Sequence, residues 1–327
     1  MSEPTELRPL KTWSHLAEQR RRPSEYEIVS TNLHWHTRGD QAFDIDDKGF
    51  MNEWYREYRN ESPITHENWD SFRDPDEMIY RGYNILQDGQ ENYVLGLLDQ
   101  FSEEEHDKGL DPEWIEILAH FYTPGRYLMH CAQMASAYLV HISPASTISN
   151  CAAFQAADCL RWVSHISYRT KELSIIYPSF GFVEKEREHW ERHQSWQAFR
   201  ELMERMLATK DWAESFLALN IITKPAIDEA FFRGLRTSGR RANDTLISLL
   251  SEAALRDSER SRRWTVSLVE MILSESSNNS QIGLWMEKWS PLANAAIEDF
   301  CSSLPDQPGA AELAISNLKK FHSQLGL

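Results

Sequence analysis

Two stretches of this sequence, 99 residues apart, repeat one spacing of side chains, and this repeat constrains the fold more than any other feature. In both stretches the residues follow one another at steps of three, four, three and four. Such steps place side chains on one face of an α-helix. Both stretches are therefore predicted to be long helices that carry an Asp-x-x-Arg pair on one face. The two sets are Cys151, Phe154, Asp158, Arg161 and His165, and Leu250, Ala253, Asp257, Arg260 and Trp264.

The remaining sequence also favours helices, because hairpin dipeptides between alternating apolar runs are nearly absent. A turn rich in Gly, Ser and Arg is expected at 234–242. Pro225 should kink or locally widen its helix, because proline removes one backbone donor. We expect an all-α fold. Its long helices are predicted at roughly 122–142, 146–177, 210–233 and 243–274, and shorter ones near 49–60, 75–102, 186–208, 280–303 and after a Pro/Gly break at 305–309.

Three helix starts are marked by a capping residue directly before a proline. They are Asp74-Pro75, Asp111-Pro112 and Thr123-Pro124.

The first part of the chain differs from the rest. Residues 1–48 are predicted to form an extended N-terminal arm, because they show no sustained helical period, and residues 49–327 a single helical domain. Aromatic residues are enriched at protein interfaces. We therefore expect the arm to pack on a partner subunit. Four tryptophans fall in the first 75 residues, where aliphatic periodicity is poor, and these are Trp13, Trp35, Trp54 and Trp69.

Charge and hydropathy exclude several classes of function. The net charge is −16, whereas nucleic-acid binding needs clustered Lys and Arg, so no nucleic-acid partner is expected. The longest uncharged stretch, 127–157, is broken by polar residues and would not span a membrane. The acidic, polar N-terminus argues against a secretory signal, so we expect a cytoplasmic protein. The four cysteines show no metal-type pairing and are expected to be buried thiols.

A charged pair on a core-facing seam is costly unless both members find partners. The simplest explanation is an ion pair along one helix surface, worth roughly a few tenths of a kcal/mol. Two such pairs on equivalent helices favour another explanation. Carboxylate-bridged diiron bundles carry Glu-x-x-His on two helices and a Glu on each of two others. In the iron-binding proteins with which we compare the chain, the first two helices read Asp-Glu-x-Arg-His, and the Asp and Arg orient the histidines.

Compared with this pattern, the supporting Asp and Arg remain but the presumed ligands are gone. The Glu positions hold Cys159 and Ser258, and the His positions hold Trp162 and Ser261. The companion helices carry no Asp or Glu at 123–157 or at 215–227. A ferrous pair needs about four carboxylates and two imidazoles. We therefore expect no catalytic, cofactor-binding or metal-binding residue in this chain.

Other motifs add no chemistry. Glu103-x-x-His106 and Glu186-x-x-His189 match the Glu-x-x-His pattern, but both lie in solvated charge clusters. His189 and His193, four residues apart, could hold a stray divalent ion, although the sequence shows no third ligand. A glycine-rich phosphate loop, a G-x-S-x-G elbow and a dinucleotide fingerprint are absent from the sequence.

The sequence resembles the hydroxylase β subunit of bacterial multicomponent diiron monooxygenases, closest to the toluene/benzene/phenol and isoprene/alkene branch. The resemblance covers nearly the full length, although relatives often carry His where this chain has Ser261. It is carried by TWSHLAEQRRRPSEYEIVS (12–30), LQDGQENYV (86–94), YTPGRYLMH (122–130), PASTISNC (144–151), DCLRWVSH (158–165), TKPAI (223–227), DSERSRRW (257–264) and WMEKW (285–289).

The resemblance implies a ferritin-like (ribonucleotide-reductase-like) bundle that has lost its diiron ligands. The implied partners are an α subunit that retains the diiron centre and a small γ subunit, in an α2β2γ2 assembly. An effector protein, a Rieske-type ferredoxin and an NADH-fed flavin reductase would complete the system. The system would insert one oxygen atom from O₂ into an aromatic ring or an alkene double bond.

In this interpretation the chain is a structural subunit of an enzyme and has no active site of its own. Asp158–Arg161 and Asp257–Arg260 would persist as buried ion pairs that fix helix register. The sequence does not identify the hydrocarbon, the regiospecificity or the contact surfaces. Two rival hypotheses are an autonomous metalloenzyme that uses a Glu-x-x-His pair, and a free-standing helical interaction protein.

Overall fold

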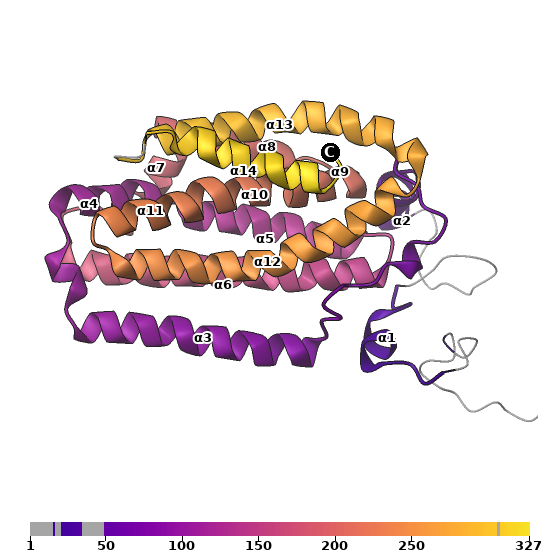
Figure 1. The fold of residues 1–327 in the computed structure, drawn as a ribbon, viewed down its shortest axis with the longest axis horizontal. Helices are drawn as coiled ribbons and strands as arrows, with labels where there is room; N and C mark the ends of the chain where they lie inside the picture. The colour runs from indigo at the N-terminus through magenta and orange to yellow at the C-terminus, as the bar shows by residue number, and fades with distance from the viewer. Residues whose placement is uncertain (1–15, 17–20, 35–48, 306–307) are drawn as a thin grey trace, which may run out of the picture.

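A computed structural model describes residues 16, 21–34, 49–305 and 308–327, and within these ranges the chain is helical and contains no strand. The all-α prediction is confirmed. Figure 1 shows an elongated bundle whose long helices run along its length. None of the helices in the described part of the chain is long and apolar enough to cross a membrane.

The helices follow the chain in a simple order. The main ones are α1 Glu25–Ser30, α2 Phe50–Tyr55, α3 Tyr80–Glu103, α4 Pro112–Ile117, α5 Gly125–Ile142, α6 Ser146–Ile176, α7 Glu186–Arg192, α8 Gln194–Leu207, α9 Trp212–Phe216, α10 Lys224–Ile227, α11 Arg233–Arg241, α12 Thr245–Leu273, α13 Asn279–Ser302 and α14 Ala310–Gln324. The π-helical turns are Arg56–Asn60, Leu118–Tyr122, Leu217–Thr223 and Asp228–Phe232, and the 3₁₀ turns are Trp69–Ser71, His106–Gly109 and Ser276–Asn278.

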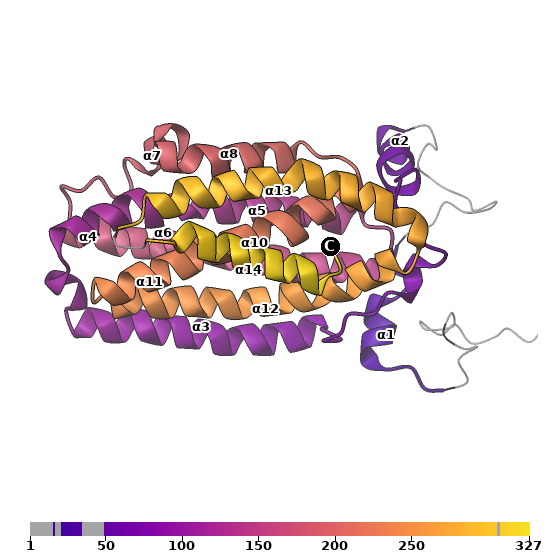
Figure 2. The same ribbon diagram turned by 45° about the horizontal axis from the view of Figure 1, so that its top comes forward.

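The bundle is layered. Helix α5 packs on α6, α11 on α12, and α8 on α13. Figures 1 and 2 show α3 along one edge beside α12, whereas α13 and α8 cover the opposite side and α14 lies over α10. Helix α4 lies at one end of the bundle, and α1 and α2 lie at the other (Figure 2). The four long predicted segments therefore form the centre of the bundle.

The third of these segments is locally widened, as Pro225 predicted. The π-helical turns Leu217–Thr223 and Asp228–Phe232 flank the short α10 that contains Pro225. Proline donates no backbone N–H. The carbonyl of Ile221, four residues earlier, accepts a hydrogen bond from Nε2 of His322 in α14 at 2.9 Å. The C-terminal helix thus supplies a donor close to the point where the proline removes one.

The turn predicted at 234–242 is wrong, because α11 continues to Arg241 and the chain turns at 242–244. The glycines in this stretch serve close packing instead. A Cβ added at Gly239 would lie 2.3 Å from Cγ2 of Ile247, and one at Gly234 would lie 2.9 Å from Cδ1 of Leu304. The two glycines let α11 approach its neighbours closely. The packing gained in this way outweighs the low helix propensity of glycine.

Of the three predicted helix starts, one is confirmed. Asp111 caps α4 by accepting the N–H of Glu113 at 2.9 Å. Asp74 instead accepts the N–H groups of Asp76 and Met78, so it caps a tight turn, and α3 begins only at Tyr80. Thr123-Pro124 lies between the π-helical turn Leu118–Tyr122 and α5, so it marks a junction within a helical run.

The predicted arm contains one short helix that was not expected. Ser24 and Glu27 form a capping box at the start of α1, and the Tyr26 hydroxyl accepts the backbone N–H of Asp74 at 3.0 Å. The Ser146 hydroxyl donates to the carbonyl of Ser30 at 2.8 Å. Residues 21–34 therefore lie on the chain's own bundle. Most of the arm, including Trp13 and Trp35, lies outside the described residues, so its packing on a partner stays a prediction.

The two later tryptophans are partly buried and contact other side chains of the same chain. Trp54 donates its indole N–H to the Tyr138 hydroxyl at 3.0 Å. The ring of Trp69 meets the edge of Trp212 at a centroid distance of 4.9 Å. These two residues therefore give no support to a partner surface.

Two glycines on long helices should respond oppositely to alanine. At Gly125 an added Cβ would lie 2.0 Å from Cζ of the buried Phe231, so we expect Gly125→Ala to cost about 1–3 kcal/mol of unfolding free energy through overpacking. At Gly96 nothing lies within 4 Å, so Gly96→Ala should stabilise the helix by up to about 1 kcal/mol. Urea denaturation measures both. Equal effects at the two positions would contradict this packing.

Candidate functional site

The two Asp-x-x-Arg motifs meet in the core and pair between helices. Arg260 of α12 contacts Asp158 of α6, and Arg161 of α6 contacts Asp257 of α12, where Nη1 and Oδ2 are 3.1 Å apart. All four residues are buried or nearly so. The expected buried ion pairs therefore exist, but the predicted pairing within each helix is wrong. Reciprocal pairing joins α6 to α12, so it fixes the register of one helix against the other.

A third helix, α3, completes this reciprocal cluster. Gln87 donates from Nε2 to Asp158 at 2.7 Å and to Asp257 at 3.2 Å, while its oxygen accepts from Arg161. Tyr83 donates its hydroxyl to Asp158 at 2.9 Å. Burial raises the pKa of Asp158 to about 6, and the guanidinium of Arg260 opposes that rise. The carboxylates are thus satisfied by several donors, as buried charges require.

Trp162 stands at a presumed histidine position and still makes a donor contact there. Its indole Nε1 donates to Oδ2 of Asp257 at 2.8 Å. An Asp that supports a metal-bound histidine accepts the same kind of N–H bond. The indole has a donor but no acceptor lone pair, so it cannot bind a metal. Asp257 therefore still accepts an N–H bond from the residue at the presumed histidine position, although that residue, Trp162, is not a metal ligand.

The presumed Glu positions are occupied by small side chains in a buried polar cluster. Cys159 is fully buried, and burial raises the pKa of its thiol to about 12. The Ser258 hydroxyl accepts from the Lys224 ammonium at 2.8 Å and donates to Oδ1 of Asp228 at 2.8 Å. Lys224 and Asp228 both belong to the widened third helix and are buried.

These core residues were missed by the sequence analysis. Lys224 is the single charged residue in the apolar run 215–227, which was a usable signal. Asp228 lies one position beyond the stretch found to lack carboxylates, and the widened helix turns it inward. A neighbouring layer is uncharged: Asn220 bonds to Gln155 at 3.0 Å and to Thr265 at 2.9 Å.

The residues at the four ligand positions do not fit a diiron centre. The donors at these positions are a thiol held protonated, an indole and two hydroxyl side chains, whereas diiron sites use carboxylates and imidazoles. The buried Lys224 side chain, which donates to Ser258, is likewise not a metal ligand of such a centre. Among the described residues, no three His, Cys, Asp or Glu side chains gather in a way that could hold a metal ion.

The two other Glu-x-x-His motifs do not form ligand pairs. His106 hydrogen-bonds to Asp244 at 3.2 Å, and Glu103 is exposed at the end of α3. Glu186 is buried against Arg126, so the expectation that its cluster is solvated is wrong for this residue. Glu186 therefore serves another contact, and Glu103 faces solvent.

The sequence did not reveal that a third histidine joins His189 and His193. The His120 ring lies 4.2 Å from that of His189 and 5.7 Å from that of His193, measured between centroids. Burial, followed by the charges of His120, His193 and Lys185, lowers the pKa of His189 to about 4. Burial and then His120 also lower the pKa of His193.

The histidine cluster predicts loss of stability in mild acid. An unfolded histidine has a pKa of about 6.5, so between about pH 6.5 and pH 4 the unfolded chain binds a proton at His189 that the folded chain does not. Stability should fall over this window. We expect His189→Gln to flatten the plot of unfolding free energy against pH between 7 and 5. An unchanged slope in the variant would contradict a neutral buried imidazole.

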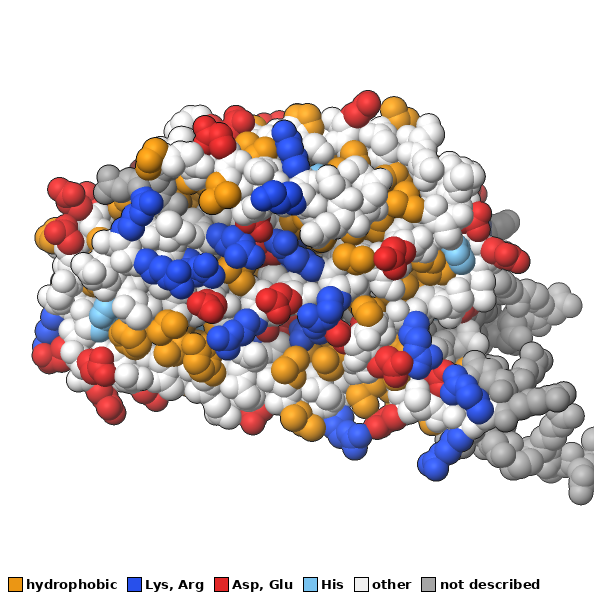
Figure 3. All heavy atoms as spheres, in the orientation of Figure 1, with side chains coloured by type: hydrophobic (Ala, Val, Ile, Leu, Met, Phe, Trp, Pro, Cys, Tyr) orange, Lys and Arg blue, Asp and Glu red, His pale blue; other side chains and the backbone are white. Residues whose placement is uncertain are grey.

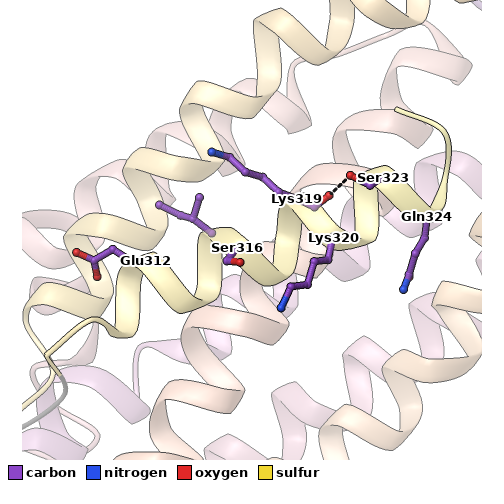
Figure 4. A pocket seen from close by; sticks show the side chains of 7 residues that line it. Glu312, Ser316, Lys319, Lys320, Ser323 and Gln324 are labelled. Carbon is purple, nitrogen blue, oxygen red and sulfur yellow. Dashed lines mark hydrogen bonds between the residues drawn. The ribbon is translucent and has the colours of Figure 1, made fainter.

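One hollow lies on the surface of the C-terminal helix. It has a volume of about 730 Å³ and is lined by residues of α14, and Figure 4 shows its side chains on the outer side of that single helix. Lys and Arg side chains form a band over α11, α12 and α14, but Asp and Glu interrupt it (Figure 3). Arg233 and Arg262, for example, both pair with Glu229. This face therefore lacks the continuous positive surface that nucleic acids select.

Comparisons with known proteins agree with the geometry. The model of the methane/phenol/alkene hydroxylase family matches residues 54–276. Over 298 residues, 91% of each chain, the sequence is 50% identical to subunit beta of the hydroxylase component of the toluene-4-monooxygenase system of Ectopseudomonas mendocina.

Two solved structures share the fold. A chain of toluene 4-monooxygenase, determined with toluene bound in the resting active site, superposes with a TM-score of 0.87 at 49% identity, covering 92% of this chain and 99% of that one. A chain of xenon-pressurised phenol hydroxylase from Pseudomonas sp. OX1 gives a TM-score of 0.85, covering 100% of this chain and 98% of the other. At 18% identity the second likeness speaks for the fold alone. The expected ferritin-like fold is confirmed.

Proposed function

The chain belongs to the methane/phenol/alkene hydroxylase family, and from this premise we propose that it is the non-catalytic β subunit of a multicomponent monooxygenase hydroxylase. One observation carries the proposal. The Asp and Arg residues of both Asp-x-x-Arg motifs are present and form ion pairs, but the four presumed iron-ligand positions hold residues that do not fit iron. Such a bundle keeps the framework of a catalytic relative and lacks its reactive centre. Its role would be to hold a catalytic bundle in place.

The proposed partner is an α subunit that carries the diiron centre, together with a γ subunit in an α2β2γ2 assembly. An effector protein, a Rieske-type ferredoxin and an NADH-dependent reductase would serve the same system. Similarity to the toluene-4-monooxygenase subunit supports an aromatic hydrocarbon or an alkene as the substrate of the assembly. We place the proposed site of action in the cytoplasm, where NADH is available.

Co-purification tests this function. We expect the tagged chain, expressed with its proposed α partner, to elute as a larger complex that contains iron, and the isolated chain to contain none. Stoichiometric iron in the isolated chain would favour the autonomous metalloenzyme instead. Elution as a single chain despite co-expression would favour a free-standing interaction protein.

The proposed arm contact predicts different effects for two sets of tryptophans. Replacing Trp13 and Trp35 with alanine should weaken association with α by about 2 kcal/mol or more, because buried aromatic anchors dominate interfaces. Trp54→Ala is the matched control, since Trp54 packs on Tyr138 within the chain and should alter stability but not association. Binding measured by biolayer interferometry, with thermal melting of each variant, separates the two effects. Unchanged affinity in the arm variants would count against the contact.

A further inference from the structure

The centre of the bundle holds a positive charge supplied by the protein itself. The Lys224 ammonium donates to Ser258 at 2.8 Å and lies 4.0 Å from Oδ1 of Asp228. Ser258 in turn donates to the same carboxylate oxygen at 2.8 Å. The Lys224 side chain is 8% exposed and that of Asp228 is 2% exposed. A charge this deeply buried is unfavourable unless an opposite charge and hydrogen bonds offset its lost hydration.

Lys224 is the inner cation of this cluster. Arg262 also reaches Asp228, with Nη2 and Oδ2 3.1 Å apart, but its side chain is 26% exposed and it also contacts Glu229. The two cations therefore approach Asp228 through different oxygens, one from the bundle interior and one from nearer its surface. Removing Lys224 would leave the Oδ1 side of the carboxylate without a charged partner.

The position of the ammonium matters as much as its charge. Ser258 occupies one of the two presumed ligand-carboxylate positions, and Cys159 occupies the other. The field of Lys224 also acts on Cys159, where it opposes the rise in thiol pKa caused by burial. The ammonium thus bonds directly to the residue at one presumed carboxylate position and acts electrostatically on the residue at the other.

We propose that the Lys224 ammonium is an internal cation that replaces the metal charge of the bundle and keeps divalent metal ions out of its centre. The missing ligands then account for part of the loss of metal binding, because a like charge also repels any incoming cation. This inference rests on the proposed function, in which the bundle has lost its metal centre. It adds that Lys224 prevents metal ions from binding there.

Metal titration of the full chain tests the exclusion. In Lys224→Ala, the vacated space would adjoin the carboxylate of Asp228 and the hydroxyl of Ser258, and the thiol of Cys159 lies within the electrostatic reach of the ammonium that is removed. We expect Co²⁺ to raise the thermal midpoint of this variant and to produce a thiolate absorption band, because Co²⁺ accepts thiolate and carboxylate ligands. The band should disappear in Lys224→Ala/Cys159→Ser. Lys224→Arg, which keeps the charge, and the wild type should not respond.

The opposite results would overturn the proposal. A wild-type chain that takes up Co²⁺ at the same site, or a folded Lys224→Ala chain that does not respond to it, would show that the ammonium excludes nothing. Neither result would change the co-elution with an iron-containing partner on which the proposed function depends. The two proposals can therefore fail separately.

If the alanine variant does not fold, the proposal can be tested by comparing the stability of a single and a double variant that remove the charges of Lys224 and Asp228. Lys224→Met keeps most of the side-chain volume and removes the charge, so the unfolding equilibrium constant should rise about 10²–10³-fold, as for other broken buried pairs. Lys224→Met/Asp228→Asn should recover part of that loss, because the carboxylate oxygen that faced Lys224 is no longer charged, while Arg262 keeps Glu229 as a partner. Lack of recovery, or a Lys224→Met variant as stable as wild type, would contradict the compensating role.

Discussion

Asp257→Leu is expected to lower the free energy of unfolding by about 2–4 kcal/mol, because it removes one of the two carboxylates that the buried guanidinium of Arg161 contacts. Asp257 accepts from Arg161 at 3.1 Å, from the Trp162 indole at 2.8 Å and from Gln87 at 3.2 Å. The substitution therefore leaves the Trp162 indole N–H without its acceptor, while Arg161 keeps Glu91 and Gln87 keeps Asp158. Guanidinium chloride denaturation, with an unchanged m-value, would measure the loss.

A second substitution, added to Asp257→Leu, shows which arginine is the ion-pair partner of Asp257. Asp257→Leu/Arg161→Met should regain much of the lost stability, because both members of the buried pair become apolar. Asp257→Leu/Arg260→Met should be worse than the single variant, since it also strands Asp158. The predicted order rests on pairing between α6 and α12. Recovery by Arg260→Met instead would mean that the pairs form along each helix.

The pairing between α6 and α12 could be predicted from the sequence only in part. Steps of three and four correctly placed Asp158 and Arg161 on one face of a helix, and did the same for Asp257 and Arg260. Spacing cannot distinguish a side chain that bonds along its own helix from one that crosses to another, because both use the same face. The partner depends on the rotation of α6 against α12, which is a property of tertiary packing. Gln87, from a third helix, was likewise beyond reach.

Helix irregularity explains the other differences. A π-helical turn shifts the face on which later residues fall, so Lys224 and Asp228 could not be assigned to the core from a regular period. Gly239 was taken for a turn residue, although it serves a close approach to Ile247. The spacing of Ser24 and Glu27 matches a capping box, so the sequence contained a signal for α1 that the prediction of an extended arm overlooked.

A further buried pair joins one end of the bundle and should also be costly to break. The two terminal guanidinium nitrogens of Arg169 in α6, Nη1 and Nη2, donate to the carboxylate of Asp107, in the 3₁₀ turn that follows α3. Burial alone would lower the pKa of Arg169, but the bonds to Asp107 outweigh it and raise that pKa. Tyr177 also donates its hydroxyl to the carbonyl of Asp107. The end of α3 is thereby tied to α6 at its last turns.

We expect Arg169→Met to destabilise the chain by about 3–5 kcal/mol, because the carboxylate of Asp107 stays buried without its cation. Arg169→Lys should recover only part of this loss, since an ammonium keeps the charge but cannot donate two parallel bonds. Thermal or chemical denaturation measures both variants. Hydrogen exchange adds a local signature that a general loss of packing would not produce: amides in the second half of α3 and in α4 should exchange faster in Arg169→Met, while those of α5 keep their order of protection. If α3 and α5 lost protection equally, the pair would be stabilising the whole bundle rather than this corner.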